Sequence, residues 1–390
     1  MLESQVDLLL RDIGLIIIAA TLMANIARYL KQPNIPAYVL AGLIIGPLGL
    51  RLITNQDVIA SLGELGIAFL LFIVGLELEL KKLKEVGIQA TIISLVSAAI
   101  IFGLGTLTAI ALNYPQIEAI YIGLALTFSS TMVVIKILSD RGELDTLHGR
   151  LAITILLVQD VLVVISLIIL GSIKNPSITA IAHMLLLGIL LYSTTIVGCR
   201  KLVCPILISS RNHELTFLAA VSALFVFMQV SITTGFSIAI GAFIAGMTAS
   251  VSPYHQEVIS RVRGLRDFFS IIFFVSLGMQ IWAENIITII IPALIFTLIV
   301  VLIKPLVIAF MTRMLGYRKD VSFLTGLTLL QISEFSLIIA LQGLLTENIS
   351  TSVFSQIALV AVLSIPMTSY STKYGSVLYQ KIKKKAEYIV

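Results

Sequence analysis

Asp160 lies near the middle of an otherwise apolar run, residues 151–171. If this run is a helix that rises about 1.5 Å per residue, the carboxylate lies near the midplane of a lipid bilayer. Placing a charge at that depth costs at least about 2.5–3.5 kcal/mol on insertion scales. We therefore expect Asp160 to be a site that a proton and a metal cation occupy in turn. The alternative is a structural ion pair with Lys304.

A cluster of hydroxyl side chains occupies another apolar run, where Ser129, Ser130 and Thr131 follow one another near its centre. Serine and threonine often bond to carbonyls of their own helix, and this is the structural interpretation of such residues. Three consecutive hydroxyls are harder to explain in that way, and hard cations prefer oxygen ligands. We therefore expect these three residues, together with Gln159 beside Asp160, to bind the ion.

Two more polar groups lie within apolar runs: Lys304 in VLIKPLV, and the pair Ser333 and Glu334 in LLQISEFSL. Lys304 is expected either to pair with a carboxylate or to satisfy carbonyls exposed by an interrupted helix. Ser333 is expected to ligate the ion or to mark a helix break. Glu334 is expected to balance the positive end of a helix dipole, with direct ion ligation as the alternative.

The composition is that of a membrane protein. Of the 390 residues, 58% are hydrophobic and 12% are charged, about half the charged fraction of soluble domains. No nucleophile–base pair or metal-ligand set converges in the sequence, and Cys199 and Cys204 lack metal-ligand spacing. We therefore expect neither an enzyme nor a cofactor. The net charge of +5 follows from membrane orientation, so it does not indicate a nucleic-acid partner.

Hydropathy and helix breakers predict an all-α polytopic membrane protein with about thirteen transmembrane helices. The predicted spans are residues 12–30, 37–50, 58–79, 86–112, 117–138, 151–172, 178–199, 214–231, 233–250, 267–282, 286–311, 321–343 and 351–371. Of the 26 lysines and arginines, only Arg11, Arg51 and Lys174 lie on the side that holds the N-terminus, and Lys304 lies within a span. Because positive loops face the cytoplasm, we expect the N-terminus outside the cell and a basic cytoplasmic tail at residues 372–390. The expected location is the inner (plasma) membrane.

Thirteen spans allow a single membrane domain, residues 1–390, that contains two six-helix repeats of opposite orientation. The first repeat is predicted at residues 12–172 and the second at 214–371, with a linker helix at 178–199 between them. The segment AYVLAG at 37–42 resembles FSIAIG at 236–241. Inverted repeats are typical of transporters, whose sites lie at the membrane midplane between interrupted helices.

Three segments carry a resemblance to a known family: FIVGLELEL, LLQISEFSLIIA, and the block from LTFSSTMVV to LVQDVLVV at residues 126–164. They resemble the Kef-type and NapA-type monovalent cation:proton antiporters. The resemblance implies an NhaA-like fold with two interrupted, crossing helices, at residues 129–131 and 333–334. It implies core and dimerisation domains, an elevator-like movement and a homodimer. It also implies that Asp160 is the ion-binding aspartate and Lys304 the membrane-embedded lysine.

The predicted activity is secondary active exchange of a monovalent cation, K⁺ or Na⁺, for H⁺ by alternating access. Electrogenic sodium/proton antiporters of this family have two adjacent aspartates where this chain has Gln159 and Asp160. With only one carboxylate at this place, we expect electroneutral exchange. No G-x-G-x-x-G fingerprint follows a strand pattern, so no nucleotide-binding regulatory domain is expected. The alternative is a passive or ligand-gated cation channel, although no T-V-G-Y-G-like filter is present.

Two peripheral segments complete the expectations. The connector at residues 141–148 ends at His148, which is either a pH sensor or part of a solvated loop. The tail run KIKKK at 381–385 is expected to orient the chain and to lie against membrane lipid.

Overall fold

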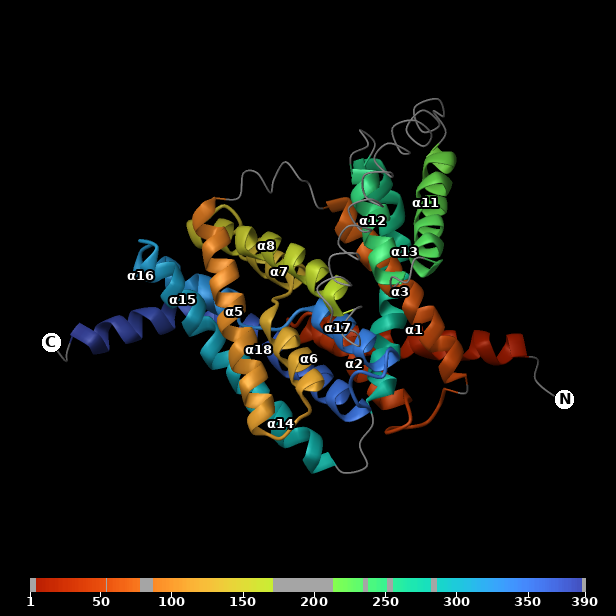
Figure 1. Cartoon of the computed structure of the whole chain (residues 1–390), viewed down its shortest axis with the longest axis horizontal. Helices are drawn as coiled ribbons and strands as arrows, with labels where there is room; N and C mark the ends of the chain where they lie inside the picture. The colour runs from red at the N-terminus through yellow and green to blue at the C-terminus, as the bar shows by residue number, and fades with distance from the viewer. Residues whose placement is uncertain are drawn as a thin grey trace. The chain divides into compact units, whose positions relative to one another are not determined.

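The computed structural model describes residues 5–53, 55–77, 87–170, 213–233, 238–250, 255–281 and 286–387, and within these ranges the regular structure is helical (Figure 1). Seven segments of this part are long and apolar enough to cross a membrane, and shorter apolar helices accompany them. The prediction of an all-α polytopic membrane protein is therefore confirmed. The count of thirteen helices stays a prediction, and the linker helix predicted at 178–199 lies outside the described residues.

The helices are α1 (Gln5–Tyr29), α2 (Asn34–Ile45), α3 (Gln56–Glu77), α5 (Ile88–Ala111), α6 (Gln116–Thr127), α7 (Thr131–Asp140), α8 (Leu147–Leu170), α11 (His213–Thr233), α12 (Ile238–Ser250), α13 (His255–Gln280), α14 (Ile286–Leu298), the π-helix η2 (Ile299–Ile303), α15 (Lys304–Met314), α16 (Lys319–Thr328), α17 (Glu334–Leu345) and α18 (Thr351–Glu387).

Three predicted spans are interrupted or distorted. The span predicted at 117–138 consists of α6 and α7, and the span predicted at 321–343 consists of α16 and α17. The span predicted at 286–311 contains α14, η2 and α15. Hydropathy averages over a window and does not detect a break of a few residues. The resemblance implied interruptions at residues 129–131 and 333–334, and breaks are present at both places.

Two helices extend beyond the predicted spans into polar sequence. α13 begins at His255, before the predicted span at 267, and α18 continues to Glu387, past the predicted end at 371. Lysine, arginine, glutamate and glutamine have good helix propensity, so helical structure continues where apolar character ends. The residues predicted as a tail are thus largely part of α18.

The chain divides into two compact units. The first unit contains Met1–Ile13, Asn55–Lys84 and Val164–Ser276, and the second contains Gly14–Thr54, Glu85–Val163 and Leu277–Val390. In the first unit, α3 packs against α12, and α12 packs against α11. The rings of Phe69 and Phe269 stack there with their centroids 5.3 Å apart. Every predicted site residue belongs to the second unit.

Two helix pairs of the second unit pack with very close backbones. α5 lies along α6, and α15 lies along α16. A Cβ atom on Gly123 would clash with the carbonyl of Phe102, and one on Gly326 would clash with the carbonyl of Pro305. Only glycine permits these approaches. The two contacts have the same spacing along the chain, and the division into two repeats stays a prediction.

α18 is the long helix around which the second unit is built (Figure 1, blue). It packs against α14, α16, α17 and α2, and it also touches α6 and α7. It therefore contacts the helices on both sides of each interruption, α6 and α7 at the first and α16 and α17 at the second.

Candidate functional site

The site is built around two helix interruptions. The first interruption, residues 128–130, separates α6 from α7, and the second, residues 329–333, separates α16 from α17. All of these residues are buried. Buried backbone groups outside a helix must find other partners. The backbone groups of both interruptions therefore bond with neighbouring helices and side chains.

Each interruption ends on a serine that caps the next helix. Ser130 Oγ accepts from the Val133 N–H at 3.2 Å, and Ser333 Oγ accepts from the Phe335 N–H at 3.1 Å. Ser336 completes a capping box at Ser333. Serine is among the best N-cap residues because its hydroxyl satisfies an N–H that the helix leaves free. The local sequence thus explains why α7 and α17 begin where they do.

Two neighbouring residues of α8 bond at the first interruption: Gln159 within it, and Asp160 at the start of α7, which follows it. Asp160 is 8% exposed, and the Thr131 hydroxyl lies 3.1 Å from each of its carboxylate oxygens. Gln159 Oε1 accepts from the Ser129 N–H at 2.9 Å. Thr131 is the first residue of α7, so the carboxylate lies at the positive end of a helix dipole.

Lys304 connects the two interruptions. Its Nζ donates to the carbonyls of Leu126 at 3.3 Å, Phe128 at 2.9 Å and Gln331 at 3.0 Å. The side chain is 1% exposed. An ammonium group has three donors, and these three carbonyls account for them. The structure thus agrees with the expectation that Lys304 satisfies the carbonyls of interrupted helices.

A π-helix places Lys304 where it can reach both interruptions. η2 ends at Ile303, and the Lys304 N–H bonds back to the Ile299 carbonyl, one residue further than in an α-helix. Pro305 follows and has no N–H to donate. Such widened turns are frequent at functional sites because they rotate the next side chain.

Two side-chain bonds join the interruptions directly. Ser129 Oγ donates to the Leu329 carbonyl at 2.8 Å, and Gln331 Nε2 donates to the Ser130 carbonyl at 3.4 Å. A movement of one interruption therefore breaks bonds to the other.

The predicted hydroxyl ligands divide into two groups. Thr131 contacts Asp160, whereas the hydroxyls of Ser129 and Ser130 bond with backbone groups. Their bonds match the structural interpretation of serine, although each oxygen retains acceptor capacity. Glu334 is buried as the first residue of α17, where a negative charge is favoured by the helix dipole. Its ligand role, like that of Ser333, stays a prediction.

Three residues at the interruptions were missed by sequence reasoning as site residues. They are Gln331 in the second interruption and the α18 residues Ser364 and Thr368. The Ile332 N–H donates to Ser364 Oγ at 3.3 Å, and the Thr368 hydroxyl lies 2.7 Å from Gln331 Oε1. Two buried polar residues four apart in an apolar helix share one face. That spacing was the available signal.

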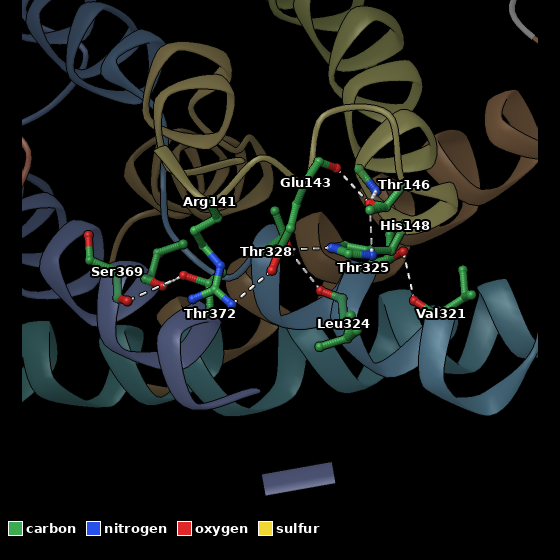
Figure 2. Close-up of polar contacts among 12 residues, drawn as sticks. Arg141, Glu143, Thr146, His148, Val321, Leu324, Thr325, Thr328, Ser369 and Thr372 are labelled. Carbon is green, nitrogen blue, oxygen red and sulfur yellow. Dashed lines mark hydrogen bonds and ion pairs between the residues drawn. The ribbon is translucent and has the colours of Figure 1, made fainter. Parts of the chain in front are cut away.

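The connector between α7 and α8 carries a charged cluster (Figure 2). Glu143 lies between Arg141 and His148, with oxygen–nitrogen distances of 2.8 and 3.3 Å. Thr146 Oγ lies 3.1 Å from His148 Nδ1. Partial burial tends to raise the pKa of Glu143, but its bonds to Arg141 and His148 outweigh burial and lower that pKa below its usual value. His148 is buried, so the expectation of a solvated loop is wrong at this residue.

Comparison with known proteins gives one family. The family model described as sodium/hydrogen exchanger, transmembrane, matches residues 15–374. The protein named K(+) efflux antiporter 5 of Arabidopsis thaliana is 33% identical over 349 residues, which cover 86% of this chain and 61% of that protein. The Na(+)/H(+)-K(+) antiporter GerN of Bacillus cereus is 28% identical over 367 residues, which cover 93% and 95%.

A solved structure has the same fold. The sodium proton antiporter MjNhaP1 from Methanocaldococcus jannaschii superposes with a TM-score of 0.73 over 95% of this chain and 97% of that one. The two are 19% identical, so the similarity concerns the fold. The chain spans about six tenths of the length of K(+) efflux antiporter 5 and of K(+) efflux antiporters 4 and 6 from the same plant.

Proposed function

Because the chain belongs to the sodium/hydrogen exchanger family, we propose that it exchanges a monovalent cation, K⁺ or Na⁺, for H⁺ across a membrane by alternating access. Asp160 is the shared site, which holds the proton and the cation in turn. The observation that carries this proposal is a buried carboxylate at an interrupted helix, with the Thr131 hydroxyl on both of its oxygens.

The ligands of the cation are the Asp160 carboxylate, the Thr131 hydroxyl and the Gln159 amide oxygen. Hard cations take oxygen ligands of these kinds. The carbonyls of Leu126 and Phe128 accept from Lys304, which therefore occupies the place that a free cation would otherwise take at the end of α6. Lys304 in this way directs the transported ion to Asp160.

Exchange is electroneutral. The single carboxylate of Asp160 binds either one proton or one monovalent cation. The occupied site therefore has the same charge when it carries the proton in one direction as when it carries the cation in the other. Lys304 exchanges no proton in this proposal, because its Nζ already bonds with the carbonyls of Leu126, Phe128 and Gln331.

Exchange is favoured over a passive or ligand-gated channel. The relatives GerN and K(+) efflux antiporter 5 are both named as antiporters. Direct hydrogen bonds also join the two interruptions. Such bonds suit a site that is accessible from one side of the membrane at a time. A channel requires a continuous path with weak binding along it.

The membrane arrangement follows from the distribution of charge. The chain is a multi-pass membrane protein, and we place its N-terminus outside and its C-terminus in the cytoplasm of a plasma membrane, with KIKKK against membrane lipid. The assembly is a homodimer in which the second unit carries the site. Cross-linking of the purified protein in lipid tests the dimer.

The test is transport by the purified protein in liposomes that contain a pH-sensitive dye. Potassium and sodium salts are added separately to wild type, Asp160→Asn and the control Asp140→Asn, which changes an exposed aspartate at the end of α7. We expect cation-driven proton movement in wild type and the control, and none in Asp160→Asn. Full activity of Asp160→Asn, or cation flux without proton movement, would contradict the proposal.

A further inference from the structure

One face of α18 holds the second interruption in place. Ser364 and Thr368 are fully buried on this face, one helical turn apart. Ser364 Oγ accepts from the Ile332 N–H at 3.3 Å, and the Thr368 hydroxyl lies 2.7 Å from the side chain of Gln331. α18 also packs along α16 and α17. A long packed helix thus fixes both the backbone and one side chain of the interruption.

The hydrogen bonds of Gln331 determine the role of Thr368. The Ser130 carbonyl can only accept, so the amide nitrogen of Gln331 must face it and the amide oxygen must face Thr368. The Thr368 hydroxyl therefore donates its hydrogen to Gln331 at 2.7 Å. Its other contact, to the Ser364 carbonyl at 3.4 Å, is longer. The bonding order runs from α18 through Gln331 to the first interruption.

We propose that Thr368 is a positioning residue for ion exchange at Asp160, acting through Gln331 and the Ser130 carbonyl. Ser130 directly precedes Thr131, whose hydroxyl lies on the carboxylate. This inference rests on the proposed function and extends it to a helix that contributes no ligand.

Loss of the Thr368 hydroxyl removes the donor to the Gln331 amide oxygen. An amide oxygen left unbonded in a buried site is costly, so the Gln331 side chain turns toward another donor. It then releases the Ser130 carbonyl. The expected consequence is a changed position of Thr131 relative to Asp160, hence a changed affinity for the cation. Thr372 offers a matched control, because its hydroxyl bonds to carbonyls of α18 itself.

The experiment measures cation-driven proton movement in liposomes for Thr368→Val, Thr368→Ala, Thr368→Ser and Thr372→Val. Cation concentration and pH are varied so that half-saturation and maximal rate are separated. We expect both hydroxyl-free variants to raise the half-saturating cation concentration about tenfold, equivalent to about 1.4 kcal/mol. The maximal rate stays within about twofold. Thr368→Ser and Thr372→Val keep the wild-type value.

A second variant tests the route through Gln331. Gln331→Leu should raise half-saturation by a similar factor, and the double variant with Thr368→Val should add little, because both changes act on one bond chain. Additive effects would overturn the proposal. So would wild-type half-saturation in Thr368→Val, an equal shift in Thr372→Val, or failure of both hydroxyl-free variants to fold when Thr372→Val folds.

The two proposals fail in different ways. If wild type moves no protons in response to either cation, the proposed function is wrong and Thr368 has no exchange to position. If wild type is active, Asp160→Asn is inactive and Thr368→Val behaves as wild type, exchange at Asp160 stands and the role of Thr368 is wrong.

Discussion

The two helix interruptions have the same backbone plan and different chemistry. In each, the residue before the capping serine offers its N–H to a neighbouring helix: Ser129 to Gln159 of α8, and Ile332 to Ser364 of α18. The residue that follows each acceptor, Gln159 or Ser364, differs between the two helices. It is Asp160 in α8 and Ile365 in α18.

This difference shows how one backbone arrangement supports two tasks. The first interruption has an acid beside its anchor and can bind a proton or a cation. The second has an apolar residue there, and its neutral anchors Ser364 and Thr368 hold it without adding charge. The buried acid of the second interruption, Glu334, instead follows the capping serine as the first residue of α17. The second interruption is thus suited to supporting the first.

The largest expected effect comes from breaking the link between the two interruptions. Lys304→Met leaves the carbonyls of Leu126, Phe128 and Gln331 without their donor. Each unsatisfied buried group costs about 1–3 kcal/mol, so thermal unfolding in detergent should show a loss of at least about 3 kcal/mol, with transport below about a tenth of wild type. Lys136→Met, at an exposed position of α7, is the control. A stable, active Lys304→Met protein would show that the interruptions do not depend on this link.

A smaller effect separates the two anchors. Gln159→Leu and Ser364→Ala each leave one buried N–H without its acceptor, so both should lower stability by about 1–3 kcal/mol. Transport should differ. Gln159→Leu should raise the half-saturating cation concentration more than about tenfold, since it adjoins Asp160, whereas Ser364→Ala should change it less than about threefold. Equal shifts in liposome transport would remove the distinction between the interruptions.

The smallest effect concerns the far end of α7, where a charged cluster holds the connector. The pKa of Glu143 is lowered in the folded protein, so its contribution to stability is present above the unfolded value near 4.5 and is lost as pH falls through the folded pKa. Glu143→Gln should lower the unfolding temperature at neutral pH by an amount worth less than about 1 kcal/mol. It should also reduce the loss of stability below about pH 4.5.

Asp145→Asn changes an exposed carboxylate of the same connector and serves as the control for Glu143. If both variants show the same unfolding temperature between pH 4 and pH 7, the contacts of Glu143 with Arg141 and His148 have no effect on stability.

The sequence by itself determined the class of protein and the charged residues that lie within its membrane spans. Long apolar runs predict a polytopic helical protein because unpaired backbone groups are excluded from lipid. Asp160 and Lys304 stand out for the same reason, since a charge within such a run is costly. The capping serines Ser130 and Ser333 are also readable, because capping is a local interaction.

Only the tertiary structure decided which groups meet. Lys304 bonds to carbonyls from positions 126, 128 and 331, and Gln331 bonds to Ser130 and Thr368. The resemblance implied both interruptions, but neither hydropathy nor residue type identified Ser364 and Thr368 of α18 as their anchors. The physical reason is that a hydrogen bond depends on distances of a few tenths of an ångström between segments far apart in the chain. Residue type and spacing show which buried groups need a hydrogen-bond partner, and packing determines which partner each group finds.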